Sequence, residues 1–575
     1  MIGLPIDGNK QSRFSRKTYF MGFAIILVLI TFLTNYLKIR FSPTPVNVDL
    51  CPIHEPISPD SFNKDNSTVL KILHDKAYRN ESVERLAGAI QIDTQIFDHQ
   101  PDVDEAPEIW IKFQKFHDYL NKTFPLVYKH LEIQKVNTYG LVYIYKGSQE
   151  SLKPVLLAAH QDTVPVQKDT IANWSYPPLS GHYDGDYIYG RGAADCKNVL
   201  IAILETFEIL LSQKYKPNRT IIAAFGFDEE SSGLHGARHI GEYLEDRFGK
   251  DSIYAVIDEG PGITIDSMTK TIFAIPGTGE KGYVDIITEL TTPGGHSSIP
   301  PDHTSIGIMA ELAYLIESDP YSPILTDKNP TLNYYQCLAL HDPHRNIPRN
   351  LKGIILRAGV DRHANARLLS YIQQNPLTRY LVRTSQALDI ISGGEKANAL
   401  PEHVSLLTNH RIAIESNLDL VRDHFISRVI DLADKHRLSI RQNGKFIYEV
   451  PDPAGVFDIT ESSALEPAPS TPTNDNVWKY LAGVTRHVFE ELVFTDLDYP
   501  IVMSPAIMTG NTDTKYYWGL SKNIFRYSPY FVANLLNDTN AHRVDEKLIF
   551  DGHLQLQAFF YEYVQAIDSE KADNE

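Results

Sequence analysis

The chain has few cysteines, and this shortage excludes two kinds of protein. Only three cysteines occur among 575 residues, at Cys51, Cys196 and Cys337. Three are too few for a scaffold built on disulfides, and they lie too far apart in the sequence for a zinc knuckle. We therefore expect that any bound metal ion is held by histidine and carboxylate side chains.

Basic residues are also in short supply, because 54 Lys and Arg face 72 Asp and Glu. With a net charge of −18, the chain lacks the broad basic surface that neutralises a phosphate backbone, and nucleic-acid binding is not expected. A content of 43% hydrophobic and 22% charged residues is typical of a globular protein. The length excludes a small single-core module and allows an enzyme of two large lobes.

One long apolar run stands near the start of the chain, over residues 20–37 (FMGFAIILVLITFLTNYL). A helix of this length nearly spans a hydrocarbon layer of ~30 Å. The run predicts a single transmembrane anchor, with a cleaved signal peptide or a buried core helix as alternatives. Residues 1–19 carry more basic than acidic residues, which predicts a cytoplasmic tail and a lumenal or exterior main part.

A proline-rich segment follows over residues 38–65, where five prolines and little apolar periodicity predict an extended stalk. A lumenal protein could be glycosylated at Asn-x-Ser/Thr sites. The candidate sites are Asn66, Asn80, Asn121, Asn173, Asn218 and Asn537.

Beyond the stalk, apolar runs at 154–160, 220–227 and 252–258 alternate with helical patterns such as 198–213. This alternation predicts an α/β catalytic lobe with a largely parallel sheet, formed by residues 66–281 and 449–575. The hydrophobic pattern changes at 283–290, where apolar and polar residues alternate, and an amphipathic helix pattern follows later. We expect an inserted α+β domain over 282–448 with helices on one face of its sheet.

Each apolar run of the catalytic lobe leads into polar residues at its carboxyl end, where open α/β sheets place their ligands. Carboxylates gathered there repel one another unless a cation lies among them, although an acidic rim exposed to solvent is the alternative. Histidine with carboxylates suits zinc or manganese. The clusters are His160 with Asp162, Asp195 before a helix, Asp228-Glu229-Glu230, Asp258-Glu259, and His542 with Asp545 and Glu546.

Several longer phrases follow one another in a specific order. They include GRGAADCKN (190–198), GFDEESSG (226–233), GGHSS (294–298), GNTDTKYY (510–517) and HRVDE (542–546). In sequence and order they resemble the aminoacylase and carboxypeptidase family of di-zinc exopeptidases. The resemblance extends over nearly the whole chain from about residue 70.

The resemblance implies two zinc ions per chain and roles for several residues of the clusters. Asp195 would bridge both ions, one of which would also be held by His160 and Asp258, and the other by Glu230 and His542. Glu229 would be the general base and Asp162 would orient His160. His296 would polarise the scissile carbonyl, Asn398 and Arg411 would bind the substrate carboxylate, and Gly510, Asn511 and Thr512 would form a substrate-binding loop.

These inferences predict a membrane-anchored zinc carboxypeptidase that releases the C-terminal residue of short peptides of the Gly-X type. The resemblance implies a vacuolar lumen, and the inserted domain could form a homodimer. One alternative is an N-acyl amino acid hydrolase that uses the same site on an acyl amide. An alternative of another class is a catalytically silent, membrane-anchored binding protein.

Overall fold

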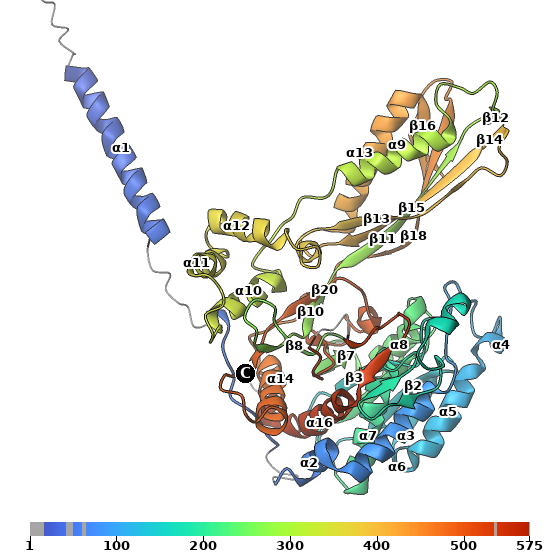
Figure 1. The fold of residues 1–575 in the computed structure, drawn as a ribbon, viewed down its shortest axis with the longest axis vertical. Helices are drawn as coiled ribbons and strands as arrows, with labels where there is room; N and C mark the ends of the chain where they lie inside the picture. Colours follow the sequence, from blue (N-terminus) through green and yellow to red (C-terminus); the bar gives the residue numbers. More distant parts are fainter. Residues whose placement is uncertain (1–15, 42–49, 60–64, 534–537, 574–575) are drawn as a thin grey trace, which may run out of the picture. The chain divides into compact units, whose positions relative to one another are not determined.

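The computed structural model describes residues 16–41, 50–59, 65–533 and 538–573 (Figure 1). The chain divides into two compact units, residues 1–49 and residues 50–575. The first unit contains helix α1 (Arg16–Phe41). All other described elements belong to the second unit.

Helix α1 includes the apolar run, but the prediction of a membrane anchor is wrong. Across the described residues, no helix combines the length and the apolar character needed to cross a bilayer. In the sequence, polar residues interrupt the run at Thr31, Thr34 and Asn35. The uninterrupted apolar stretch, residues 20–30, rises only about 16 Å, which is less than the ~30 Å hydrocarbon core. The single-pass topology with a lumenal catalytic domain was inferred from this anchor and is corrected with it. The vacuolar location came from the resemblance and depended on the same topology, so it is corrected as well.

The predicted α/β lobe is built on an eight-stranded sheet with the order β1-β2-β6-β3-β7-β21-β10-β20. Neighbours β6, β3, β7 and β21 run parallel. Strands β3, β6 and β7 are buried along their whole length, because helices cover both faces of the sheet. The strands are β1 (Glu132–Val136), β2 (Gly140–Tyr145), β3 (Val155–His160), β6 (Ile221–Gly226), β7 (Ala255–Asp258), β10 (Gly277–Glu280), β20 (Ala506–Met508) and β21 (Ile524–Arg526).

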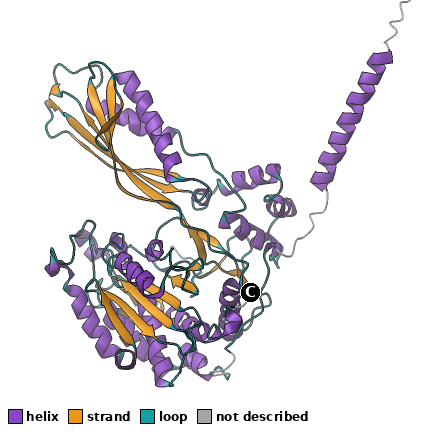
Figure 2. Ribbon diagram, turned by 180° about the vertical axis from the view of Figure 1, so that it is seen from behind, coloured by secondary structure: helices purple, strands orange, loops and turns teal. Residues whose placement is uncertain are grey.

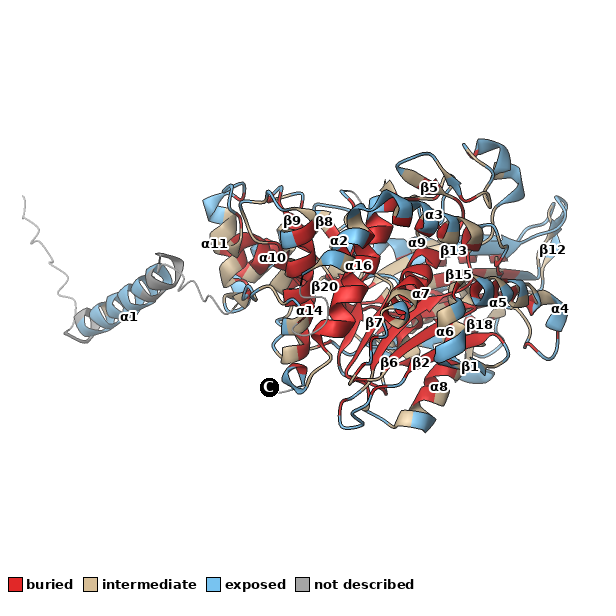
Figure 3. Cartoon of the chain, turned by 90° about the horizontal axis from the view of Figure 1, so that it is seen from below, coloured by how far each residue is buried: buried red, intermediate tan, exposed pale blue. Residues whose placement is uncertain are grey.

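Helices pack on the two faces of this sheet around separate hydrophobic cores. Helices α7 and α16 contribute to the larger core and α8 to the smaller one, and the buried surfaces of α7 and α16 stand out in Figure 3. The helices of this lobe are α2 (Ser67–His74), α3 (Lys76–Ile90), α4 (Pro107–Trp110), α5 (Lys112–Thr123), α6 (Pro125–His130), α7 (Lys197–Ser212), α8 (Ala237–Phe248), α14 (Asn476–Arg486) and α16 (Phe550–Ala566).

Three smaller sheets complete the strand inventory of the described residues. Two have three strands, in the orders β22-β5-β4 and β19-β9-β8, and one pairs β12 with β14. Their bounds are β4 (His182–Tyr183), β5 (Tyr187–Tyr189), β8 (Ile263–Ile265), β9 (Ile272–Ala274), β12 (Gly295–His296), β14 (Ala399–Leu400), β19 (Val502–Met503) and β22 (Lys547–Ile549).

The inserted domain is a six-stranded sheet with the order β13-β15-β11-β18-β16-β17, packed against α9 (Ser305–Ser318) and α13 (Leu418–His436) (Figure 2). The sheet continues past the expected boundary at residue 448, because β18 pairs with β11 along nearly its whole length. The strands are β11 (Gly282–Thr291), β13 (Ser385–Gly393), β15 (His403–Ile412), β16 (Leu438–Gln442), β17 (Lys445–Tyr448) and β18 (Gly455–Leu465).

Three helices between α9 and β13 share a further hydrophobic core: α10 (Pro330–Leu340), α11 (Arg349–Arg357) and α12 (Arg362–Ile372). A disulfide joins Cys337 of α10 to Cys51. The backbone N–H of Ile57 also donates to the carbonyl of Gly483 at 2.9 Å. Residues 50–59, which were expected in an extended stalk, therefore pack against the folded unit.

The candidate glycosylation sites differ in exposure. Asn80, Asn121 and Asn173 are exposed, whereas Asn66 and Asn218 are half-buried. Asn537 lies outside the described residues. Glycosylation at these positions stays a prediction.

Candidate metal centre and active site

The candidate site forms where three neighbouring parallel strands end. His160 is the last residue of β3, Glu229 and Glu230 follow β6, and Glu259 follows β7. Because β6, β3 and β7 are adjacent and parallel, their carboxyl ends meet at one edge of the sheet. The topology thus gathers three of the acidic clusters recognised in the sequence.

Asp195 contributes a carboxylate to the centre of this group from the turn before α7. Its Oδ1 lies 3.1 Å from Nε2 of His160, and its Oδ2 lies 3.0 Å from Nε2 of His542. Each oxygen therefore faces a different histidine. A carboxylate in this arrangement can bridge two cations.

Two glutamates complete the two halves of the group. Oε1 of Glu230 lies 3.1 Å from Nε2 of His542, and Oε2 of Glu259 lies 3.4 Å from Nε2 of His160. Two ligand atoms that are each about 2.1 Å from one tetrahedral ion lie about 3.4 Å apart. The observed separations of 3.0 to 3.4 Å match this spacing, so the donors fit a pair of metal ions.

Asp258, the ligand expected from the sequence, does not join this group. It is the last residue of β7, and successive side chains on an extended chain point to opposite sides. Its Oδ1 accepts the backbone N–H of Glu259 at 2.9 Å, and its buried Oδ2 has no hydrogen-bond partner among the described residues. Glu259 is thus the residue of this pair that faces His160.

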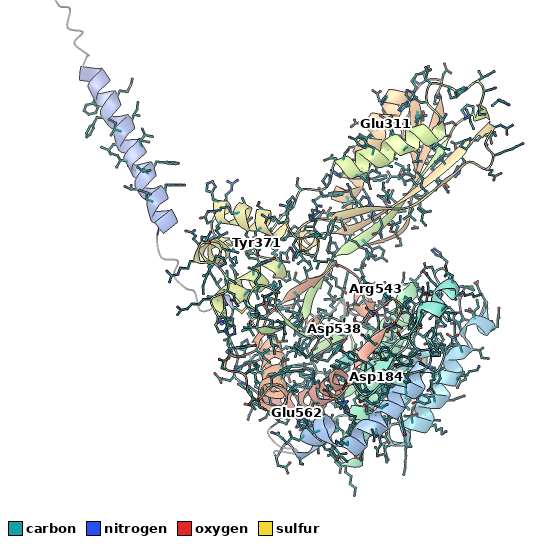
Figure 4. The ribbon with its side chains drawn as sticks, in the orientation of Figure 1. Asp184, Glu311, Tyr371, Asp538, Arg543 and Glu562 are labelled. Carbon is teal, nitrogen blue, oxygen red and sulfur yellow. A yellow bond between two sulfur atoms is a disulfide. The ribbon has the colours of Figure 1, made fainter. Side chains whose placement is uncertain are left out.

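His542 lies on a loop close to the C-terminal helix. Its backbone φ is 62°, in the left-handed region that non-glycine residues seldom adopt. The side chain is half-exposed, in contrast to the fully buried His160. The neighbouring Arg543, labelled in Figure 4, marks this loop on the side of the catalytic lobe that faces the inserted domain.

Asp162 contacts one residue from each half of the group. Its Oδ2 accepts the backbone N–H of Glu230 at 3.0 Å, and its Oδ1 lies 3.4 Å from Nδ1 of His160. Nδ1 of His160 is also 3.0 Å from the backbone carbonyl oxygen of Asp162. Contacts at Nδ1 fix the ring orientation and leave Nε2 directed at Asp195 and Glu259.

The pKa values of the acidic side chains in this group are shifted because several ionisable side chains are buried close together. Burial, together with Asp195, raises the pKa of Glu259 to about 8 despite the nearby His160. Burial and the charge of Glu259 also hold the pKa of Glu229 well above its usual range. Burial would raise the pKa of Asp195 too, but hydrogen bonds from His160 and His542 lower it strongly. Cations placed among these groups would relieve the repulsion between the carboxylates.

A cavity of about 640 Å³ opens beside this group and is lined by both the catalytic lobe and the inserted domain. Nη1 of Arg411 donates to Oδ1 of Asn511 at 2.8 Å, and Nδ2 of Asn511 donates to the carbonyl of Lys281 at 2.6 Å. No salt bridge within the described ranges involves Arg411. The lining includes Asp195, Glu229, Glu230, Glu259, Arg411, Gly510, Asn511, Thr512 and His542.

Two residues predicted from the resemblance do not line this cavity. His296 belongs to β12, and Asn398 directly precedes β14. Both are exposed, and β12 and β14 lie at the end of the inserted sheet farthest from the catalytic lobe (Figure 1). Within one chain, His296 and Asn398 are therefore apart from the candidate metal ligands.

Sequence reasoning missed two residues of the site. Glu259 was placed in an acidic cluster but was given no ligand role, whereas in the structure its carboxylate faces His160. Cys196 is buried, and its sulfur forms a compact group with donor atoms of His160 and Glu259. The expectation that only histidine and carboxylate approach the site therefore leaves out one thiol.

Known proteins resemble this chain over most of its length. Residues 156–566 match the model of "Peptidase family M20/M25/M40". Carboxypeptidase S of Saccharomyces cerevisiae is 41% identical, over 98% of this chain and 99% of that protein. The human N-fatty-acyl-amino acid synthase/hydrolase PM20D1 is 30% identical, over 89% of this chain and 90% of that protein.

Solved structures share the fold at lower identity. A metallo-carboxypeptidase of the M20 family from Sulfolobus solfataricus superimposes with a TM-score of 0.54 at 15% identity, over 85% of this chain and 99% of that one. The dipeptidase Dug1p of Saccharomyces cerevisiae superimposes with a TM-score of 0.55 at 13% identity, over 87% of this chain and 98% of that one. The chain belongs to peptidase family M20/M25/M40 and is a metallo-carboxypeptidase.

Proposed function

We propose that this carboxypeptidase uses two zinc ions to release the C-terminal residue from short peptides of the Gly-X type. The observation that carries the proposal is the position of Asp195, whose two oxygens face His160 and His542 separately. One ion would be held by His160, Asp195 and Glu259, and the other by Asp195, Glu230 and His542. Glu259 thus takes the place that the sequence analysis gave to Asp258.

The donor set supports zinc as the metal. Imidazole nitrogens and carboxylate oxygens are the ligands of many catalytic zinc sites, and magnesium or calcium would favour oxygen donors alone. Bound zinc supplies a lowered water pKa and polarises a carbonyl oxygen. The role of each protein side chain follows from where it lies relative to these donors.

Glu229 is suited to move protons. It lies beside the ligand Glu230 and lines the cavity, and burial raises its pKa above the usual range of a carboxyl group, which favours the acceptance of a proton. Its carboxylate would take a proton from the attacking water and later deliver it to the nitrogen of the leaving amino acid. Asp162 would act indirectly, because it holds the imidazole of His160.

Arg411 is suited to bind the free carboxylate of the substrate. Its guanidinium is only partly buried and lines the cavity, and the ring of Tyr283 lies 5.6 Å from its central carbon. Asn511 and Thr512 line the same cavity. A guanidinium can bind a carboxylate through two parallel N–H donors, which favours a C-terminal residue over an internal one.

The proposed role of His296 requires a second copy of the chain. Its Nδ1 contacts Oγ of Ser298 at 2.7 Å, while the ring remains exposed outside the cavity. A homodimer formed through the inserted domain could bring His296 to the partner's substrate. Mixing subunits that carry Glu229→Gln with subunits that carry His296→Ala tests this, because only a hybrid dimer would then contain one complete site. No recovery of activity in a mixture with proven subunit exchange would contradict the role.

A second candidate substrate class is the N-acyl amino acids. The human relative, 30% identical, is named as an N-fatty-acyl-amino acid synthase/hydrolase. Peptides and acyl amides place the same carbonyl and the same terminal carboxylate in the site. A comparison of kcat/KM for blocked Gly-Leu and for a long-chain acyl-leucine distinguishes the two classes.

The central test combines metal analysis with product release. The purified protein should contain two zinc ions per chain and release leucine from blocked Gly-Leu. A chelator should abolish the release, and added zinc should restore it. A metal-depleted protein with full activity would refute the proposal.

A further inference from the structure

Glu546 is a buried carboxylate that no step of the proposed mechanism uses. It lies just after the loop of His542, and none of its surface is exposed. Its Oε1 accepts three backbone N–H groups, from Gly192 and Ala194 at 3.0 Å and from Asp195 at 3.2 Å. Its Oε2 accepts Nη1 of Arg191 at 2.5 Å. One side chain thus binds most of the turn that ends in Asp195.

The backbone around Glu546 is attached to the same turn. Its carbonyl accepts the N–H of Gly190 at 2.9 Å, and the next residue, Lys547, pairs with Tyr189 as β22 joins β5. On the other side, Asp545 accepts the N–H and the hydroxyl of Ser175 at 2.6 and 2.8 Å. The residues that follow His542 therefore attach its loop to the body of the protein.

These contacts connect two candidate ligands that are far apart in the sequence. Asp195 is the last residue of the turn that Glu546 binds, and His542 lies four residues before Glu546. Apart from its contacts with Asp195 and Glu230, the side chain of His542 has no hydrogen bond among the described residues, and it is half-exposed. Its distance from Asp195 therefore depends on where the backbone of the loop places it.

The charge of Glu546 matters as well as its shape. All four groups that it binds are N–H donors, so a carboxylate, which only accepts hydrogen bonds, satisfies every one of them. A glutamine has one accepting oxygen and one NH₂ group, which would face a donor. Buried donors without an acceptor are costly, so the turn would rearrange.

We propose that Glu546 is a positioning residue that sets the separation of Asp195 and His542 and thereby the affinity of the metal site that they share. The inference rests on the proposed function in one respect, namely that these two residues bind metal. Supporting residues of this kind typically change metal affinity about 10- to 100-fold when they are replaced.

The test compares Glu546→Gln and Glu546→Asp with a matched control, Asp568→Asn. Asp568 is a partly buried carboxylate that also accepts backbone N–H groups, from Asn218 at 2.8 Å and from Arg219 at 2.6 Å, but it does not line the cavity. The first measurement is hydrogen exchange in the metal-free proteins. In Glu546→Gln, the amides of Gly192, Ala194 and Asp195 should exchange faster, whereas the control should leave them unchanged.

The second measurement is zinc affinity by competition with a chelating dye. Glu546→Gln should bind the weaker of two zinc ions about 10- to 100-fold less tightly, Glu546→Asp should lie between it and the parent, and Asp568→Asn should match the parent. Unchanged exchange at the three amides, or zinc affinity within about twofold of the parent, would overturn the proposal. If Glu546→Gln does not fold, the same comparison is made with Glu546→Asp.

The two proposals can fail separately. If His542→Ala and the parent bind zinc equally, the proposed metal site is wrong, whatever Glu546 does. If His542→Ala loses zinc while Glu546→Gln keeps it, the metal site stands and the positioning role falls.

Discussion

Replacement of Arg411 by alanine should weaken the hydrolysis of free-acid peptides much more than that of other substrates. In the structure, Asn511 occupies only Nη1 of the guanidinium, at 2.8 Å. The remaining N–H groups are free to bind a substrate carboxylate, and no acidic side chain among the described residues competes for them as a salt-bridge partner. A hydrogen bond to a charged group contributes about 1.5 to 3 kcal/mol, or roughly 10- to 150-fold in kcat/KM.

The assay measures kcat/KM for blocked Gly-Leu with a free or an amidated C-terminus. Arg411→Ala should lower the value for the free acid by the factor given above, and Arg411→Lys should recover part of the loss, because an ammonium group cannot form the two parallel bonds. The amide should be a poor substrate for the parent and nearly insensitive to the replacement.

A control variant separates this effect from general damage to the inserted domain. Arg422→Ala removes another arginine of that domain, which pairs with Glu461 at 2.7 Å and does not line the cavity. It should leave the ratio of free-acid to amide hydrolysis unchanged. If the parent cleaves both peptides equally well, Arg411 does not bind the substrate carboxylate.

Three other changes probe the site and the stability of the chain. Glu229→Gln should keep two zinc ions and lose about 10²- to 10⁴-fold in kcat, whereas Glu230→Gln should lose zinc first and regain activity with excess zinc. Glu259→Gln should lower zinc affinity, whereas Asp258→Asn should bind zinc as the parent does. Burial lowers the pKa of His410 to about 4. The free energy of unfolding should therefore fall by up to about 3 kcal/mol as the pH decreases from about 6.5 to 4. His410→Phe should reduce this pH dependence.

Each of these predictions has an outcome that contradicts it. Equal zinc content and equal activity in the Glu229 and Glu230 variants would remove the division of roles. Loss of zinc in Asp258→Asn but not in Glu259→Gln would restore the original assignment. Stability should fall with decreasing pH because the imidazole of His410 takes up a proton near pH 6.5 in the unfolded chain but only near pH 4 in the folded chain. If the free energy of unfolding of His410→Phe, measured by denaturant titration, depends on pH as in the parent, this prediction is wrong.

Much of the catalytic lobe could be predicted from local patterns. The runs that became β3, β6 and β7 are apolar throughout because both faces of the sheet are covered, and this property is visible in the residues themselves. Polar residues follow each run directly. Because neighbouring parallel strands end at one edge, His160 and Glu230 could be placed together before any coordinates were known.

Features that depend on contacts between distant segments could not be predicted in this way. Cys51 and Cys337 are separated by 286 positions, and nothing in either local sequence indicates that they meet. The inserted sheet extends to residue 465 because β18 pairs with β11, and pairing between distant strands is not encoded in either strand alone. The membrane anchor shows the opposite error, because it was predicted from one local apolar run and the structure does not support it.

Asp258 and Glu259 show most clearly what the sequence determined and what the tertiary structure determined. The sequence by itself determined that an acidic pair follows β7, and therefore that a carboxylate would reach the metal edge of the sheet. It did not determine which of the two faces His160, because adjacent side chains point to opposite sides and a shift of one residue exchanges them. Only the pairing of β7 with β3 and β21 set that orientation, in the same way that only the packing of Glu546 against the turn at 190–195 brought His542 to Asp195.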